Sequence, residues 1–135
     1  MQTDQELNYL TKSLQHHPSP YIIYELDGSI AWANIAANYI FNLDSLEELS
    51  VVRIDEKITN NFGDLDSIAL YYDTPIEISL REINFFMRTR VHMIPVDVSN
   101  GIMLIELLCS SRSGLDALRQ TIDCIEHKRI ELAYQ

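Results

Sequence analysis

The stretch that decides the fold runs from Tyr21 to Phe41 and reads YIIYELDG, then SIAWAN, then IAANYIF. Two short runs rich in Ile, Tyr and Trp meet at Asp27-Gly28, a dipeptide that accommodates the positive φ angles of a tight two-residue hairpin turn. From Asn34 onward the apolar residues recur at helical spacing. The pattern predicts a strand, a turn, a second strand and then a helix over residues 34–43.

The two strands of this hairpin have no clearly polar face. In the first, Ile22 and Tyr24 alternate with Tyr21 and Ile23. A sheet that is apolar on both faces is usually covered on both, by helices, by a ligand or by a partner.

A helix is predicted before the hairpin, over Thr3 to His17, and Pro18 and Pro20 end it. Its apolar stripe consists of Leu7, Leu10 and Leu14. A stripe of this kind has to pack on something, either its own domain or the same helix of a second subunit. The sequence leaves both open.

Three further strands are predicted after the hairpin, over residues 75–83, 85–98 and 101–109, with Asn100-Gly101 as a second tight turn. Between hairpin and strands, residues 44–74 show short helical patterns at 45–49 and 64–71, so we expect a helical cross-connection there. The predicted fold class is α+β: a five-stranded antiparallel sheet with a helical cross-connection, flanked by an N-terminal and a C-terminal helix.

The tail from Arg112 to Gln135 has a heptad pattern, which is typical of a helix that pairs with another helix. Its predicted seam residues are Leu115, Leu118, Ile122, Ile125 and Leu132. The chain thus divides into an N-terminal helix (1–19), a domain (20–110) and a pairing helix (111–135). Because the heptad is still in register at the last residue, we expect a longer protein to continue beyond it.

The composition limits the class of partner. Ten basic against twenty acidic residues give a net charge of −10, which disfavours nucleic acid and anionic lipid as partners. No run is long and apolar enough for a membrane span, and the N-terminus lacks the pattern of a signal peptide. With only two cysteines, far apart, we expect a cytoplasmic protein without disulfides.

The motif D-G-x-I-x-x-x-N-x-A, formed by Asp27, Gly28, Ile30, Asn34 and Ala36, resembles that of a PAS (sensory-box) domain. The element order resembles in particular the input domains of bacterial sensor histidine kinases of the nitrogen-regulation and flagellar type. The resemblance covers about Pro18 to Cys109 and implies structural roles for Asp27, Gly28 and Asn34, which hold the hairpin to the start of the helix. It also implies a cavity between the sheet and the helices. By strand parity and helix face, its expected lining is Tyr24, Trp32, Tyr39, Phe41, Phe85, Met87, Val91, Met93 and Ile105.

No cofactor or metal site is evident. A flavin that forms a cysteinyl adduct needs a reactive Cys in a polar helix start, and neither Cys109 nor Cys124 lies in one. A haem version of the fold needs an axial His before the late strands, and residues 49–72 contain none. The other histidines lack metal-ligand spacing; His92 is expected to face outward beside Arg90.

No catalytic motif is visible either. His127 is followed by Lys128 and not by the acidic residue of a phosphoaccepting kinase histidine, the proline of that motif is missing, and there is no phosphate-binding Gly-rich loop. The sequence therefore favours a dimeric regulatory module that acts on an effector in cis or on a partner protein, as in a two-component sensor histidine kinase. The alternative is a PAS-like ligand-binding or catalytic domain of another effector, such as a diguanylate cyclase, a transcriptional regulator or a small enzyme.

Overall fold

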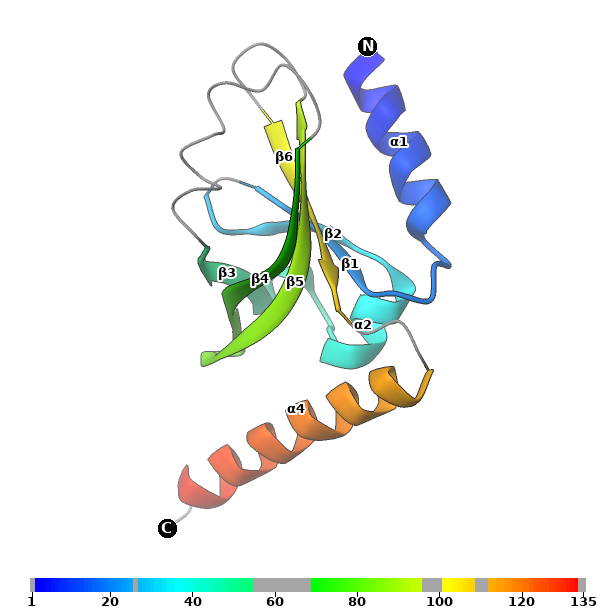
Figure 1. Cartoon of the computed structure of the whole chain (residues 1–135). Helices are drawn as coiled ribbons and strands as arrows, with labels where there is room; N and C mark the ends of the chain where they lie inside the picture. Colours follow the sequence, from blue (N-terminus) through cyan, green and yellow to red (C-terminus); the bar gives the residue numbers. More distant parts are fainter. Residues whose placement is uncertain (1, 26, 55–68, 96–100, 109–111, 134–135) are drawn as a thin grey trace.

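A six-stranded antiparallel sheet with strand order β2-β1-β6-β5-β4-β3 forms the body of the molecule (Figure 1). The computed structural model describes residues 2–25, 27–54, 69–95, 101–108 and 112–133. The elements are α1 (Gln2–Leu14), β1 (Tyr21–Tyr24), β2 (Ile30–Ala33), α2 (Ile35–Phe41), the 3-10 helix η1 (Leu46–Glu48), β3 (Leu49–Arg53), β4 (Ala69–Leu80), β5 (Ile83–Pro95), β6 (Gly101–Leu107) and α4 (Arg112–Ala133). The predicted α+β fold, an antiparallel sheet flanked by terminal helices, is confirmed.

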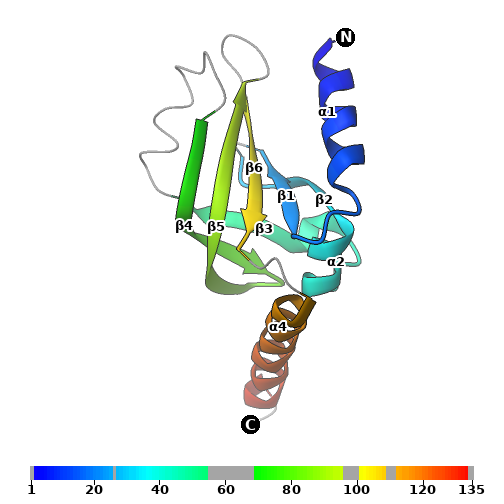
Figure 2. The same cartoon turned by 45° about the vertical axis from the view of Figure 1, so that its right-hand side comes forward.

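The two faces of the sheet carry separate apolar clusters. On the inner face, alternate residues of the strands pack with α2 into the main core; Ile22, Ile78 and Ile105 are fully buried there. On the outer face, Tyr21, Ile23 and Leu104 form a smaller cluster, against which Leu10 and Leu14 of α1 pack. The two layers explain why neither face of the first strands is polar. Figure 2 shows α1 beside the sheet, and α4 beyond the end at which α2 lies.

The prediction of a two-residue turn in the hairpin is wrong. The strands end at Tyr24 and begin again at Ile30, and residues 25–29 connect them. Asp27 Oδ1 accepts a hydrogen bond from the Ser29 amide (2.9 Å), and this side-chain turn lengthens the loop. Gly28 has φ of +99°, and a Cβ there would lie 3.2 Å from the Val51 carbonyl oxygen, so both the conformation and the space require glycine.

The sheet differs from the predicted one in two respects. The expected five strands are six, because Leu49–Arg53 forms an edge strand where a helical connection was predicted. Leu49 and Val51 are both buried, so a period of two was present in this short segment. In addition, β4 begins at Ala69 and not at Pro75. Of the two predicted helical segments, 45–49 contains only η1; 64–68 lies outside the described residues, and Ala69–Tyr71 belongs to β4.

Asn34 fastens the N-terminal elements together from a fully buried position. Its Oδ1 accepts hydrogen bonds from the amides of Tyr21 (2.9 Å) and Ala37 (3.0 Å), the second of which caps α2. Its Nδ2 donates to the carbonyl oxygens of Leu14 and Ser19, both at 2.9 Å. One side chain thus joins the end of α1, the start of β1 and the first turn of α2.

Candidate functional site

The C-terminal helix is docked on the body of the domain. Leu115 and Ile122 of α4 are only 6% and 4% exposed and belong to the main core cluster, while Leu118 packs against its edge. The element that receives them is α2, against which α4 lies. Full burial of a Leu or Ile side chain contributes about 1.5–3 kcal/mol, so these residues hold α4 in place.

The docking residues are the same ones that the heptad pattern assigns to a pairing seam. Leu115, Leu118 and Ile122 face the chain's own domain, and Ile125 is half-buried. Leu132 belongs to α4, but its side chain lies outside the described part of the structure, as does that of Leu7 in α1. In α1, Leu10 and Leu14 pack on the outer-face cluster of their own chain.

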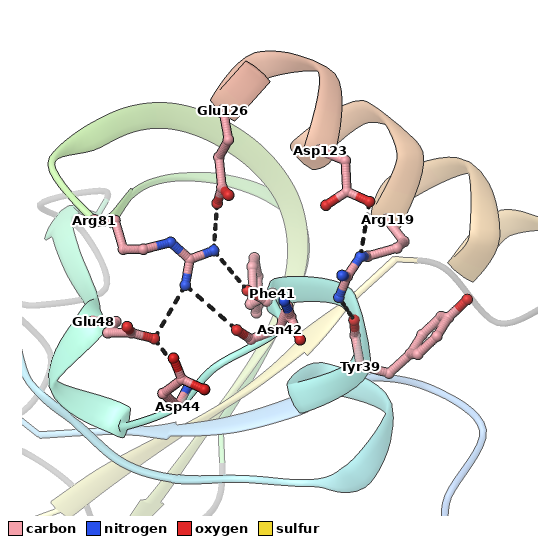
Figure 3. A network of polar contacts seen from close by, with 9 residues as sticks. All are labelled: Tyr39, Phe41, Asn42, Asp44, Glu48, Arg81, Arg119, Asp123 and Glu126. Carbon is pink, nitrogen blue, oxygen red and sulfur yellow. Dashed lines mark hydrogen bonds and ion pairs between the residues drawn. The ribbon is translucent and has the colours of Figure 1, made fainter. Parts of the chain in front are cut away.

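A polar cluster around Arg81 ties α4 to two other elements (Figure 3). The Arg81 guanidinium donates to the Glu126 carboxylate on α4 and to Glu48 Oε2 in η1 (3.1 Å). It also donates to the carbonyl oxygen of Phe41 (3.0 Å), in the last turn of α2. Carbonyls at a helix C-terminus lack intrahelical donors and carry partial negative charge, so a cation is favoured there. We call the contacts of Arg81 with Phe41, Glu48 and Glu126 the Arg81 clasp.

The backbone at the clasp is strained. Arg81 and Glu82 form the turn between β4 and β5, whose ends pair at Leu80 and Ile83, and their φ angles are +47° and +71°. Gly and Asn accept such angles easily, whereas other residues lose roughly 1–2 kcal/mol each. The Arg81 amide is anchored by donation to the Glu48 carbonyl oxygen (2.9 Å). A strained conformation that is held by several contacts is a feature often found at functional positions.

The carboxylates of the clasp further favour the charged form of Arg81. Desolvation by burial would lower the pKa of Arg81, but the Glu126 and Glu48 carboxylates outweigh it, and the pKa is raised. The three side chains are between 25% and 29% exposed, so salt screens their interactions less than those of a surface pair.

A second polar contact fixes α4 along α2. Arg119 donates to the carbonyl oxygen of Tyr39 (2.6 Å) and to Asp123 on its own helix (3.1 Å), and its guanidinium lies 5.9 Å from the centre of the Tyr39 ring. The Tyr39 hydroxyl donates to Asp116 (2.7 Å). Two arginines, from the hairpin and from α4, therefore satisfy carbonyl groups at the C-terminal end of α2 (Figure 3).

Most residues of the expected internal cavity lie in the main core. Phe85 is half-buried against that core. The buried members are Tyr24, Phe41, Met87, Val91, Met93 and Ile105. Trp32 and Tyr39 do not join them: Trp32 packs on the outer face near α1, and Tyr39 is 40% exposed. For Trp32, the prediction from strand alternation is wrong because the pairing of β2 with β1 is irregular. Trp32 lies opposite Ile23, whereas Ile30, two residues earlier, lies opposite Tyr24 on the other face.

The outer face carries a half-buried polar cluster on β1, β5 and β6. Glu106 accepts a hydrogen bond from Arg90 (2.9 Å), and His92 Nε2 lies 4.0 Å from Glu106 Oε1. Burial, together with the nearby Glu106, raises the pKa of Tyr21 to about 12. Burial also lowers the pKa of His92, with Arg90 adding to the effect and Glu106 opposing it. His92 lies on the outer face of the sheet with Arg90, as predicted, but it does not face solvent, because its side chain is only 26% exposed and its Nε2 is buried.

Within the described ranges, no group of three or more His, Cys, Asp or Glu side chains is arranged to hold a metal ion. Cys124 is exposed on α4, whereas Cys109 lies outside the described residues. Among the helices of the described part, none combines the length and apolar character that crossing a membrane requires.

No family model and no curated protein matches this chain. A chain in the crystal structure of the E. coli DhaR(N)-DhaL complex superposes on it with a TM-score of 0.49 and 13% sequence identity. The match covers 78% of this chain and 36% of that chain, so this chain spans about a third of the length of its structural neighbour. A likeness of this size carries no argument about function.

Sequence reasoning missed Arg81, Arg119 and Glu126. One sequence feature could have pointed to Arg81. Two alternating runs meet at Arg81-Glu82, and this turn lacks the Gly or Asn that a two-residue hairpin turn prefers. Which carboxylate Arg81 meets depends on where α4 docks, and charge patterning does not determine this.

Proposed function

We propose that this chain is a sensory or regulatory module whose output is the state of α4, either docked on α2 or free to pair with another helix. One observation carries the proposal: Leu115 and Ile122 are buried in the chain's own core and are also seam positions of the heptad pattern.

Docking and pairing compete for these residues. A side chain buried against α2 is not available to a coiled coil, and an undocked α4 would expose an apolar stripe that a second helix can cover. A signal that favours either state shifts the balance by its differential affinity for the two states.

The Arg81 clasp is suited to set this balance. Arg81 stands at the tip of the hairpin of the two longest strands, β4 and β5, and contacts α4 through Glu126. A movement of the sheet therefore changes the position of a group that holds α4. Because the Arg81 side chain is partly buried and bonded to three elements, small displacements weaken its hydrogen bonds, whose strength depends steeply on geometry.

The resemblance to PAS input domains supports the finer proposal that the module belongs to a cytoplasmic sensor histidine kinase, where a dimer would pass the signal to the kinase. The alternative is another effector, such as a diguanylate cyclase, a transcriptional regulator or a small enzyme. Native mass spectrometry discriminates between them in part, because a stoichiometric bound cofactor would favour a ligand-processing domain. We expect neither haem nor an adduct-forming flavin.

Hydrogen exchange tests the docked state. In the wild type, amides of residues 115–126 should exchange slowly, as expected for a helix packed on a core. In Ile122→Asp, which places a charge at the docked face, they should exchange roughly ten times faster or more, while β5 and β6 keep their protection. Exchange that is equally fast in both proteins would show that α4 is not docked in solution, and the proposal would fail.

A further inference from the structure

A pocket lies where the end of α1, the outer side of α2 and the first turns of α4 meet. Its volume is about 310 Å³, which is the lower end of the range for small-molecule sites. The described lining residues are His16, His17, Pro18, Ile35, Ala36, Tyr39 and Leu115. The pocket opens at the surface beside the exposed Ile35 and Tyr39, while two of its lining residues, Ala36 and Leu115, belong to the main core. Of the residues expected to line the internal cavity, only Tyr39 is in the described lining of this pocket.

The walls are mostly apolar although they are open to solvent. Ile35 is 47% exposed and Tyr39 is 40% exposed, and the two side chains lie one turn apart on the same short helix. Ala36 and Leu115 form buried parts of the lining. A molecule bound here would remove apolar surface of both α2 and α4 from water.

Two aromatic residues of the lining are held in place by contacts within the chain. The Tyr39 hydroxyl donates to Asp116, so the ring is fixed relative to α4. His17 Nδ1 accepts a hydrogen bond from the Ser19 amide (3.0 Å), and its ring meets the Tyr21 ring edge-on at 5.2 Å. Because Nδ1 is an acceptor, the proton of the neutral imidazole is on Nε2, and Nε2–H is the donor that this ring can offer to a ligand.

The charges around the pocket disfavour an anionic ligand. Among the described lining residues there is no Lys or Arg, the adjacent Asp116 is acidic, and the nearby Arg119 is already bonded to Tyr39 and Asp123. The net charge of −10 also disfavours anions. We propose that this pocket binds a small, uncharged aromatic molecule with one hydrogen-bond acceptor, which accepts a hydrogen bond from His17 Nε2–H.

The position of the pocket couples it to the helix. Leu115 and Tyr39 belong both to the lining and to the α2–α4 contact, so a bound molecule would add apolar contacts that exist only while α4 is docked. This regulatory part rests on the proposed function, whereas binding itself does not. A ligand of this class is then expected to stabilise the docked state.

Three probes of similar shape test the chemistry by titration in two-dimensional NMR: acetophenone, which is neutral with an acceptor; ethylbenzene, which lacks the acceptor; and benzoate, which is anionic. We expect acetophenone to bind with shifts centred on Ile35, Tyr39 and Leu115, about fivefold more tightly than ethylbenzene and about tenfold more tightly than benzoate, as one hydrogen bond and one unfavourable charge imply. His17→Phe, which keeps an aromatic ring, should abolish the preference over ethylbenzene.

The matched variants are Ile35→Trp, which fills the pocket from its exposed rim, and Val52→Trp, which makes a similar change at a 51% exposed position on β3. Binding of acetophenone should be lost in the first and kept in the second. No binding to the wild type at millimolar concentration, equal binding of benzoate, or unchanged binding to Ile35→Trp would overturn the proposal. Specific binding that leaves hydrogen exchange of α4 unaltered would support the pocket and contradict its coupling to α4, so the two failures are distinguishable.

Discussion

Arg81 and Glu126 form an ion pair that joins the tip of the β4–β5 hairpin to α4, 45 positions further along the chain. The same guanidinium also binds Phe41 at the end of α2 and Glu48 in η1. One side chain from the sheet thus meets the helix that leaves the domain. This makes Arg81 the residue whose removal should change the state of α4 most directly.

Arg81→Met keeps an unbranched, largely apolar side chain and removes the charge. We expect it to lower the free energy of unfolding by about 1–3 kcal/mol, since partly buried hydrogen bonds to charged groups are lost and two carboxylates are left without their cation. Urea denaturation measures the change. The matched control is Arg88→Met, because the Arg88 side chain is 69% exposed and its pair with Asp73 is a surface pair, so its loss should cost less than about 1 kcal/mol. Equal effects of the two substitutions would argue against the clasp.

Arg81→Asn distinguishes the loss of the clasp contacts from the backbone strain of the turn. Asn tolerates the left-handed conformation, so relief of roughly 1 kcal/mol of backbone strain should partly offset the lost contacts. The free energy of unfolding of Arg81→Asn should lie closer to that of the wild type than that of Arg81→Met does. In both variants, hydrogen exchange in α4 should be faster than in the wild type. If Asn were as destabilising as Met, strain at this turn would play no part.

Asn34→Ala should be among the most damaging single substitutions in the domain. It removes a fully buried side chain that makes four hydrogen bonds to the backbone. The buried amides of Tyr21 and Ala37 and the buried carbonyl oxygen of Ser19 lose this partner, whereas the Leu14 carbonyl oxygen keeps its bond to the His17 amide. We expect a loss of about 3 kcal/mol or more, measured by urea denaturation. Asn84→Ala, at an exposed position of β5, is the control and should change stability by less than about 0.5 kcal/mol. A mild effect at Asn34 would contradict its fastening role.

Acid should weaken the fold through His92. Burial, assisted by Arg90, lowers the pKa of His92 in the folded state below its ordinary value of 6.5, so the unfolded chain takes up the proton first as the pH falls. The contribution of neutral His92 to the free energy of unfolding is therefore complete above pH 6.5, and it decreases as the pH falls toward the folded-state pKa of His92. His92→Gln should remove part of this decrease in melting temperature between pH 7 and 5, whereas His16→Gln, at an exposed position, should not. Identical pH profiles for all three proteins would contradict the assignment.

Much of the fold could be predicted from local patterns, because they report directly on local structure. Asn34 at the start of α2 and the alternation in β4 and β5 are examples, since a cap and a period of two are properties of a few neighbouring residues. The prediction from alternation was wrong for Trp32. An irregularity in the pairing of β2 turns this side chain to the outer face, and no feature of the segment IAWA indicates it.

The candidate site was less accessible to prediction for a different reason. A heptad pattern shows that Leu115 and Ile122 need an apolar partner, but a second helix and the chain's own α2 satisfy this need equally. Arg81 and Glu126 meet only because the hairpin and α4 come together in three dimensions. Information of that kind is in the tertiary arrangement and not in the spacing of residues.

Analytical ultracentrifugation of the wild type, Arg81→Asn and Arg81→Asn combined with Ile122→Asp, at matched concentrations, tests most directly whether docking and pairing of α4 compete. We predict that Arg81→Asn self-associates about tenfold more tightly than the wild type, because freeing α4 exposes its seam, and that the added Ile122→Asp abolishes the increase. If Arg81→Asn associates no more tightly than the wild type while hydrogen exchange shows its α4 released, docking and pairing do not compete, and the proposed switch is contradicted.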